Sequence, residues 1–235
     1  MKVGMIQSNY IPWRGYFDLI DDVDLFIIYD DVEFGQGRKW RNRNRIKTRN
    51  GSRWMTVPLV HGKRHKPISD VEIDRSRDWP NRHLNLLAEN YRDSPYFSEY
   101  IGEFAEILGS RHRGVSSLNV CLIKWVMSEL GIDTSIGYSR EFFSAGGKTI
   151  RPLQILREVG ARFYLSGPTA EPYTDATLFR NHGIELEFKS YEYRPYPQMW
   201  GGYIESLSVL DLLFNCGPKA REYLKSSTPN RRVTG

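Results

Sequence analysis

The chain has 235 residues, of which 40% are hydrophobic and 13% aromatic, and its formal net charge is +5 at pH 7. No run of roughly 18 apolar residues is present and no charged-then-apolar signal segment follows Met1, which excludes a helical membrane span and argues against a secretory leader. A chain of this length can bury a sizeable core, so we expect one cytoplasmic domain over residues 1–235.

The N-terminal segment is predicted to form a strand over residues 2–6, a turn-rich loop over 7–15 and a short helix over 16–23. A loop that follows a strand and feeds a helix N-terminus presents backbone N–H groups to an anion. We expect five of its side chains to line a pocket: Gln7, Asn9, Tyr10, Trp13 and Tyr16. In the alternative interpretation, Pro12, Trp13 and Gly15 only shape the turn and fill the core. The position of the loop is similar to the phosphate loop of nucleotidylyltransferase-like folds, although it contains no histidine.

An apolar run over residues 24–29 predicts a buried strand that ends in Asp30 and Asp31. Ligands of open α/β sheets gather at the carboxyl ends of the strands. The two carboxylates are candidates for a general base, a metal ligand or a partner for arginine. Because successive residues of a strand point to opposite faces, we expect only one of them to reach the pocket.

The positive charge of the chain is concentrated between residues 35 and 66. This segment holds eleven lysines and arginines and no acid, so the rest of the chain carries a charge of −6, which is 5 − 11. Within it, Asn42, Arg43, Asn44 and Arg45 alternate between amide and guanidinium side chains. A strand with no apolar face lies at an edge or lines a polar cleft, where guanidinium groups can bind phosphate or carboxylate. A solvated edge strand is the alternative.

The remaining elements predict an α/β fold with a mainly parallel open sheet, covering helices and a β-hairpin insertion, similar to nucleotidylyltransferase-like folds. The hairpin is predicted from the strand-like runs 44–48 and 54–59 around Asn50-Gly51. A central helical segment spans about 78–131, with helices over 79–91, 95–108 and 116–130. The expected elements that follow are a strand over 134–138, a helix over 149–159, a strand over 162–165, a short helix over 176–181, a strand over 184–188, a helix over 207–214 and a frayed tail from about 227.

Two further polar residues are candidates for binding. Ser166 lies in a loop directly after a predicted strand, and Asp211 is an acid within an otherwise apolar helix, where a carboxylate needs a partner. The five histidines show no metal-ligand spacing, so we expect no metal site, and no sequence motif identifies a cofactor. Cys121 and Cys216 lie in apolar helical patterns and are expected to be packing residues in a reducing compartment.

Several motifs in combination resemble the WbqC-like protein family, and they extend over almost the whole chain. They are Gln7-x-Asn9-Tyr10-x-Pro12-Trp13-x-Gly15-Tyr16-Phe17, Asp30-Asp31-Val32-x-Phe34, Arg41-Asn42-Arg43-Asn44-Arg45-Ile46-Lys47, Trp54-x-Thr56-Val57-Pro58, and Leu207-Ser208-x-x-Asp211-Leu212-Leu213-Phe214-Asn215-x-Gly217. Ser8 stands where proline is common in the first motif.

The resemblance implies a bacterial protein associated with surface-polysaccharide, O-antigen or other sugar biosynthesis, and a glycine or aminoacyl transferase activity. Together with the basic segment, this gives our leading hypothesis, a transferase that modifies an aminosugar and binds an anionic small molecule such as a nucleotide sugar or an acyl donor. A second hypothesis is a nucleic-acid-binding protein, with tRNA as partner, because the basic segment also contains Trp40 and Trp54. A third is a nucleotidylyltransferase relative with altered or lost chemistry.

Overall fold

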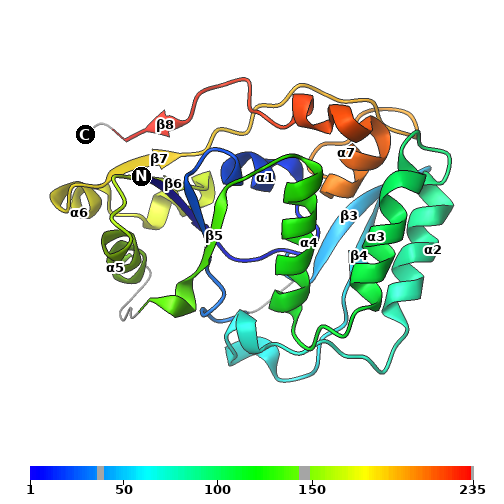
Figure 1. The fold of residues 1–235 in the computed structure, drawn as a ribbon, viewed down its shortest axis with the longest axis horizontal. Coiled ribbons are helices and arrows are strands. Elements are labelled where there is room, and N and C mark those ends of the chain that lie inside the picture. The colour runs from blue at the N-terminus through cyan, green and yellow to red at the C-terminus, as the bar shows by residue number, and fades with distance from the viewer. Residues whose placement is uncertain (36–39, 143–148, 234–235) are drawn as a thin grey trace.

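The computed structural model describes residues 1–35, 40–142 and 149–233, so Arg38, Lys39 and Gly146-Gly147 lie outside the described residues. The described chain forms a six-stranded sheet and a separate two-stranded hairpin (Figure 1). The strands of the large sheet are β1 (Lys2–Ile6), β2 (Leu25–Ile28), β5 (Ser135–Tyr138), β6 (Phe163–Ser166), β7 (Glu185–Phe188) and β8 (Arg231–Arg232), in the order β5-β2-β1-β6-β7-β8. The first five strands of this order are parallel, which confirms the predicted fold class.

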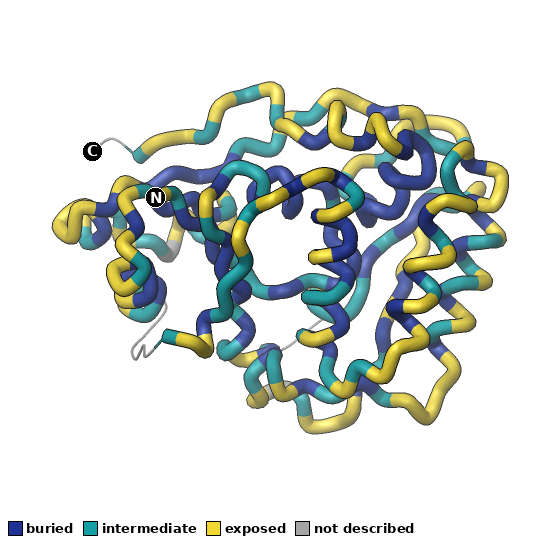
Figure 2. The backbone as a smooth tube through the Cα atoms, viewed as in Figure 1, coloured by how far each residue is buried: buried dark blue, intermediate teal, exposed yellow. Residues whose placement is uncertain are grey.

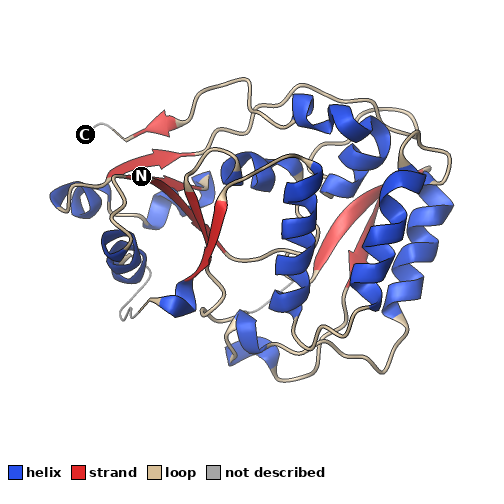
Figure 3. Ribbon diagram, in the orientation of Figure 1, coloured by secondary structure: helices blue, strands red, loops and turns tan. Residues whose placement is uncertain are grey.

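Seven α-helices are present in the described residues: α1 (Arg14–Ile20), α2 (Trp79–Tyr91), α3 (Phe97–Gly109), α4 (Val115–Glu129), α5 (Ile150–Glu158), α6 (Ala176–Asn181) and α7 (Val209–Cys216). Short 3-10 helices occur at Lys63–His65, Ile68–Asp70, Ser139–Glu141, Pro168–Tyr173 and Gly217–Tyr223. In Figure 3, α5 and α6 lie at one end of the molecule, while α2, α3 and the hairpin lie at the other, beyond α4. None of the described helices is both long and apolar enough to cross a bilayer.

The sheet is buried on both faces because its strands alternate between two apolar clusters. Val3 and Met5 belong to the cluster that contains the buried residues of α5 and α6, whereas the buried side chains of α1 and α4 belong to the second cluster. Gly4 allows α1 to approach β1 closely, since a Cβ atom there would lie 2.9 Å from Leu19 Cδ2. Figure 2 shows the resulting pattern, with buried strands inside and the outer faces of α2 and α3 exposed.

The hairpin consists of β3 (Arg43–Thr48) and β4 (Gly51–Thr56). Its turn is tighter than expected, because Thr48 pairs with Gly51 and only Arg49 and Asn50 connect the strands, so β4 begins three residues before the predicted start at Trp54. Gly51 has a φ of 101°, which suits glycine. The hairpin is joined to α7 through the main chain, where Ser208 N–H donates to the Arg45 carbonyl at 2.8 Å.

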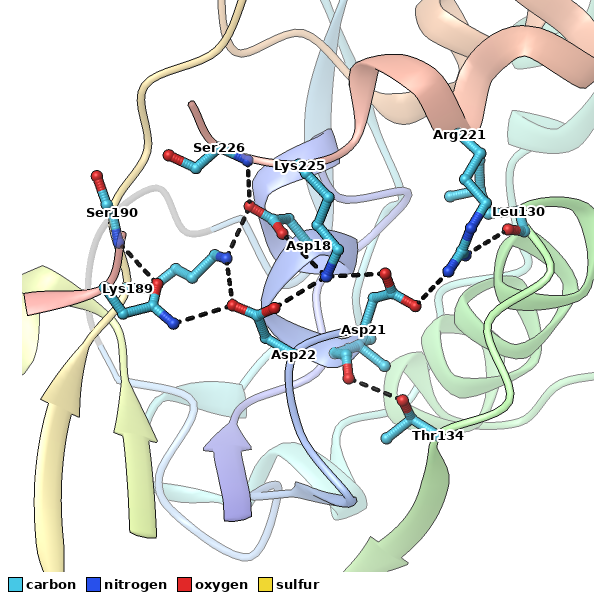
Figure 4. A network of polar contacts seen from close by, with 12 residues as sticks. Asp18, Asp21, Asp22, Leu130, Thr134, Lys189, Ser190, Arg221, Lys225 and Ser226 are labelled. Atoms are coloured by element: carbon cyan, nitrogen blue, oxygen red, sulfur yellow. Dashed lines mark hydrogen bonds and ion pairs between the residues drawn. The ribbon is translucent and has the colours of Figure 1, made fainter. Parts of the chain in front are cut away.

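The tail from about residue 227, which was expected to be frayed, contains the short strand β8. Arg231–Arg232 pair with β7 as an antiparallel strand, and Ser226 N–H donates to Asp18 Oδ2 at 3.0 Å. Lys189 and Lys225 extend the same network to the acids at the end of α1 (Figure 4). Sequence periodicity could not reveal this, because the tail is held by ion pairs rather than by an apolar stripe.

Candidate functional site

The direction of the chain reverses at the centre of the sheet. From β1 it runs outward through β2 to β5, and it later returns to the other side of β1 to form β6 and β7. In open α/β sheets the crevice beside the carboxyl ends of two such strands is where ligands bind. A cavity of about 590 Å³ lies there between β1 and β6. Its polar lining residues are Gln7, Tyr29, Glu33, Arg41, Thr149, Arg151, Tyr164, Ser166, Thr169 and Thr174.

Arg41 is a cation in this cavity with few partners. Its Nη1 donates to the Phe34 carbonyl at 2.6 Å, and its buried Nε has no hydrogen-bond partner among the described residues. Burial lowers the pKa of Arg41, and the negative charge of Asp30 opposes this shift. A guanidinium remains protonated at neutral pH even so. A half-buried cation with unused donors is suited to bind an anion.

A second arginine, Arg151, enters the cavity from the first turn of α5. It forms an ion pair with Asp31, whose side chain is 18% exposed, and its guanidinium carbon lies 5.5 Å from the Tyr29 ring centroid. Asp31 also accepts a hydrogen bond from Ser139 Oγ. The ion pair neutralises much of the charge of Arg151, while the N-terminus of α5 adds a partial positive charge at the same place.

Two tyrosines give the cavity neutral hydroxyl groups. Burial raises the pKa of Tyr29 to about 12, with Arg151 opposing the shift, and burial also raises the pKa of Tyr164. Both side chains are therefore neutral at neutral pH, and the Tyr164 hydroxyl is hydrogen-bonded to Ser166. The carboxylate at the rim is Glu33, whose side chain is 66% exposed and lies 3.9 Å from His65 Nδ1. The lining thus combines anion-binding groups with one acid.

Asp30 has a different environment from the one expected. It accepts hydrogen bonds from Ser8 N–H at 2.8 Å, Ser8 Oγ at 2.6 Å and Ser116 Oγ at 2.5 Å. Asp30 and Asp31 both line a neighbouring pocket of about 410 Å³ rather than the cavity itself. The two acids follow the end of β2 at Ile28. Asp30 contacts Ser116 of α4 and Asp31 pairs with Arg151 of α5, so the two side chains point toward helices of different apolar clusters.

The loop after β1 contributes mainly Gln7 to the cavity. Tyr16 Oη donates to the Gln7 carbonyl at 3.1 Å and so positions that residue. Tyr10 is buried and its hydroxyl lies 2.9 Å from His83 Nδ1, while the half-buried Trp13 packs edge-on against Tyr191 and Tyr193. Asn9 is half-buried and does not line the cavity.

The side chains of Arg43, Asn44 and Arg45, in the segment where arginine and asparagine alternate, point to two faces of the hairpin. Asn44 points inward and donates to the carbonyls of Tyr10 and Ile11, whereas Arg43 and Arg45 lie on the other face, against Trp54. Asn42 donates to the Val57 carbonyl at 2.9 Å. None of these four candidates from residues 42–45 lines the cavity between β1 and β6.

Of the remaining candidates, Ser166 lines the cavity and Asp211 does not. Asp211 is completely buried and accepts hydrogen bonds from Tyr91 Oη at 2.6 Å and Tyr196 Oη at 2.8 Å. Burial raises the pKa of Asp211, and these two hydrogen bonds oppose the shift. A carboxylate in an apolar helix was expected to need a partner, and the hydroxyl groups of Tyr91 and Tyr196 are the partners of Asp211.

Arg151 was not among the sequence-predicted candidates, and Arg41 was predicted only as a member of the basic segment. Arg151 could have been found from its position, since it lies in the first turn of a helix that precedes a strand of the sheet. Arg41 belongs to the basic segment but lies before the first residue of β3. Its place in the cavity, apart from Arg43 and Arg45, depends on the path of the chain before the hairpin, which the sequence pattern does not give. Among the described residues, no group of three or more histidine, cysteine, aspartate or glutamate side chains is arranged to hold a metal ion.

Comparison with protein-family models matches residues 7–223 to the WbqC-like protein family. The chain belongs to the WbqC-like family. This WbqC-like protein is 44% identical over 227 residues to "Uncharacterized protein Rv1507c" of Mycobacterium tuberculosis (strain ATCC 25618 / H37Rv), an alignment that covers 95% of this chain and 97% of that protein. Comparison with solved structures gives no match. The family match includes every polar residue that lines the cavity.

Proposed function

We propose that this WbqC-like protein is a transferase that binds an anionic, nucleotide-linked substrate in the cavity between β1 and β6 and transfers an acyl or aminoacyl group to an amine. The observation that carries the proposal is the half-buried Arg41, whose Nε has no partner within the described chain and which faces a cavity of about 590 Å³ at the reversal of the sheet. An anion there would satisfy donors that burial has removed from water.

The roles of the lining residues follow from their charges. Arg41 and the N-terminus of α5 would bind a phosphate or diphosphate, with Arg151 held in place by Asp31. Glu33 at the rim would bind the accepting amine, and the hydroxyls of Tyr29 and Tyr164 would donate to sugar or acyl oxygens. In this reaction the amine nitrogen attacks the acyl carbonyl carbon, and the bond from that carbon to the leaving group of the donor breaks. The leaving group departs with the electron pair and takes up the proton that the amine loses.

Family membership supports a role in sugar or surface-polysaccharide biosynthesis, in which aminosugars carried on nucleotide diphosphates are suitable acceptors. We place the reaction in the cytoplasm, since Cys121 and Cys216 are both free thiols, as is usual in a reducing compartment.

The test is a thermal-shift screen of nucleotide sugars, coenzyme A thioesters and nucleoside triphosphates against the unmodified protein and two variants. A ligand at about 100 times its dissociation constant adds about 2.7 kcal/mol, or roughly 5 to 10 °C in melting temperature for a chain of this size. The Arg41→Gln variant should weaken binding about tenfold and so lose about half of this stabilisation. The matched control is Arg157→Gln, at an exposed position on α5 that does not line the cavity.

An unchanged shift in Arg41→Gln would contradict the proposed site, and no shift with any nucleotide sugar or thioester would contradict the substrate class. Release of pyrophosphate from a nucleoside triphosphate would instead favour nucleotidylyl transfer, the chemistry of the folds that the sheet and its first loop are similar to. The absence of histidine from residues 7–16 argues against that reaction.

A further inference from the structure

Aromatic and guanidinium groups stack on one face of the hairpin. The Arg43 guanidinium carbon lies 3.8 Å from the Trp54 ring centroid, and that of Arg45 lies 5.7 Å from Trp54 and 5.8 Å from Trp40. The centroids of the two indole rings are 5.2 Å apart. We call these four residues the Arg–Trp face. The arginines lie opposite Thr56 and Trp54 in the strand register, so both strands build the same face.

This face is open to solvent although its rings are large and apolar. Trp40 is 46% exposed and Trp54 is 38% exposed, which places them among the few exposed large hydrophobic residues of the described chain. Exposed indoles beside arginines are typical of binding surfaces rather than of cores. Two further exposed arginines lie in the same hairpin: Arg49 in the turn, with its guanidinium carbon 4.3 Å from the Trp200 ring centroid, and Arg53 in β4, where it lines the adjoining groove.

A groove of about 740 Å³ adjoins the Arg–Trp face between β4 and α2. Its lining includes Trp54 and the cations Arg53, Lys63, Arg77 and Arg82, and the acids that line it are Asp74 and Glu89. The chain from residue 35 to residue 69 contains no acid. Positively charged side chains therefore extend over a surface that can contact several phosphate groups rather than one.

We propose that the Arg–Trp face and the adjoining groove bind single-stranded nucleic acid. Bases would stack on the faces of Trp40 and Trp54, and arginines on either side would contact the phosphates. A duplex keeps its bases stacked inside, so it cannot use the indole faces. An acidic peptide would satisfy the charges but would leave the aromatic faces without a planar partner.

This inference goes beyond the proposed transferase activity, because it concerns a different surface. Arg41 lines the cavity between β1 and β6, whereas Trp54 lines the groove beside α2. The two sites can be tested independently: Arg41→Gln is expected to weaken nucleotide-sugar binding while leaving oligonucleotide binding unchanged.

The experiment measures fluorescence anisotropy of labelled single-stranded RNA and DNA of about 12 nucleotides, with a duplex of the same sequence as competitor. If four phosphates are neutralised, the affinity for a single strand falls about 50-fold between about 50 and about 200 mM salt, from a slope of about −0.7 per contact. The double variant Arg49→Gln/Arg53→Gln should reduce the magnitude of that slope by about 1.4. The matched control is Arg157→Gln, which should leave the slope unchanged.

Stacking is tested at Trp54. Trp54→Ala should weaken binding about tenfold, and Trp54→Phe, which keeps an aromatic ring, should recover most of that loss. Unfolding midpoints of the variants exclude a loss of fold. The proposal is overturned if Trp54→Ala binds as tightly as the unmodified protein, if the duplex competes as well as the single strand, or if a polyglutamate peptide binds with equal affinity.

Discussion

Replacing Asn44 tests whether this side chain is a structural clamp or a ligand-binding group. It is 2% exposed, and its Nδ2 donates to the carbonyls of Tyr10 at 3.2 Å and Ile11 at 2.7 Å. Its Oδ1 accepts from Arg45 N–H at 2.8 Å. Ile11 has a φ of 36°, an unfavourable value for a β-branched residue, so the loop needs outside support.

The three hydrogen bonds of Asn44 set the size of the effect. At about 1 kcal/mol for each bond, Asn44→Ala should lower the free energy of unfolding by about 3 kcal/mol. For a chain of this length, that corresponds to roughly 6 to 12 °C in melting temperature. Asn44→Asp should be worse at neutral pH, because a buried carboxylate would face two carbonyl oxygens. Urea unfolding at equilibrium measures both differences.

The matched control is Asn85→Ala, at an exposed position of α2, where alanine should change stability by less than about 0.5 kcal/mol. A loss below about 1 kcal/mol in Asn44→Ala, together with loss of ligand binding, would refute the clamp and return Asn44 to the binding residues.

Three further outcomes are expected. Gly217→Ala should lower the free energy of unfolding by at least about 3 kcal/mol, since this residue has a φ of 50° and a Cβ atom there would lie 2.4 Å from the Tyr96 ring. Gly102→Ala, in open space on α3, should instead raise it by about 0.5 kcal/mol, and urea unfolding measures both changes. Burial lowers the pKa of His83 to about 4, so the unfolded state binds more protons than the folded state below about pH 6.5. The free energy of unfolding should therefore fall by about 3 kcal/mol as the pH drops from about 6.5 to 4. A His83→Gln variant with the same dependence of stability on pH would contradict this. Lys189→Met removes the cation that lies 2.8 Å from the buried Asp18 carboxylate, and it should lower the free energy of unfolding by about 3 to 5 kcal/mol in thermal or urea unfolding (Figure 4). A double variant that also carries Asp18→Asn should recover part of this loss, and no recovery would contradict the explanation.

Most of the regular structure could be predicted because it depends on local patterns. The buried strand β2 and the helix α4 are continuous or periodic apolar segments, and the glycine after α4 has the positive φ of a helix end. The strand β8 could not be predicted in this way. Its two arginines carry no apolar pattern, and it forms only where β7 offers a free edge.

The candidate site was less predictable because its residues come together only through the order of the strands. Gln7 and Ser166 were predicted, and they meet in one cavity since β1 and β6 are neighbours in the sheet. Asp211 was also predicted from its chemistry, but it lies among tyrosine hydroxyls in the core. A polar residue in an apolar segment indicates that a partner exists, and only the fold decides whether that partner is a ligand or another side chain.

The alternation of arginine with asparagine has a physical reason that links the loop after β1 to the hairpin. Tyr10 N–H donates to the Trp40 carbonyl at 3.0 Å, and Asn44 donates to the carbonyls of Tyr10 and Ile11. Because the Asn44 amide donates hydrogen bonds to the main chain of the strained loop, this side chain must face inward. The alternation of side chains along a strand then directs Arg43 and Arg45 outward. The same short strand therefore supports the loop that carries Gln7 toward the cavity and displays cations on the opposite face.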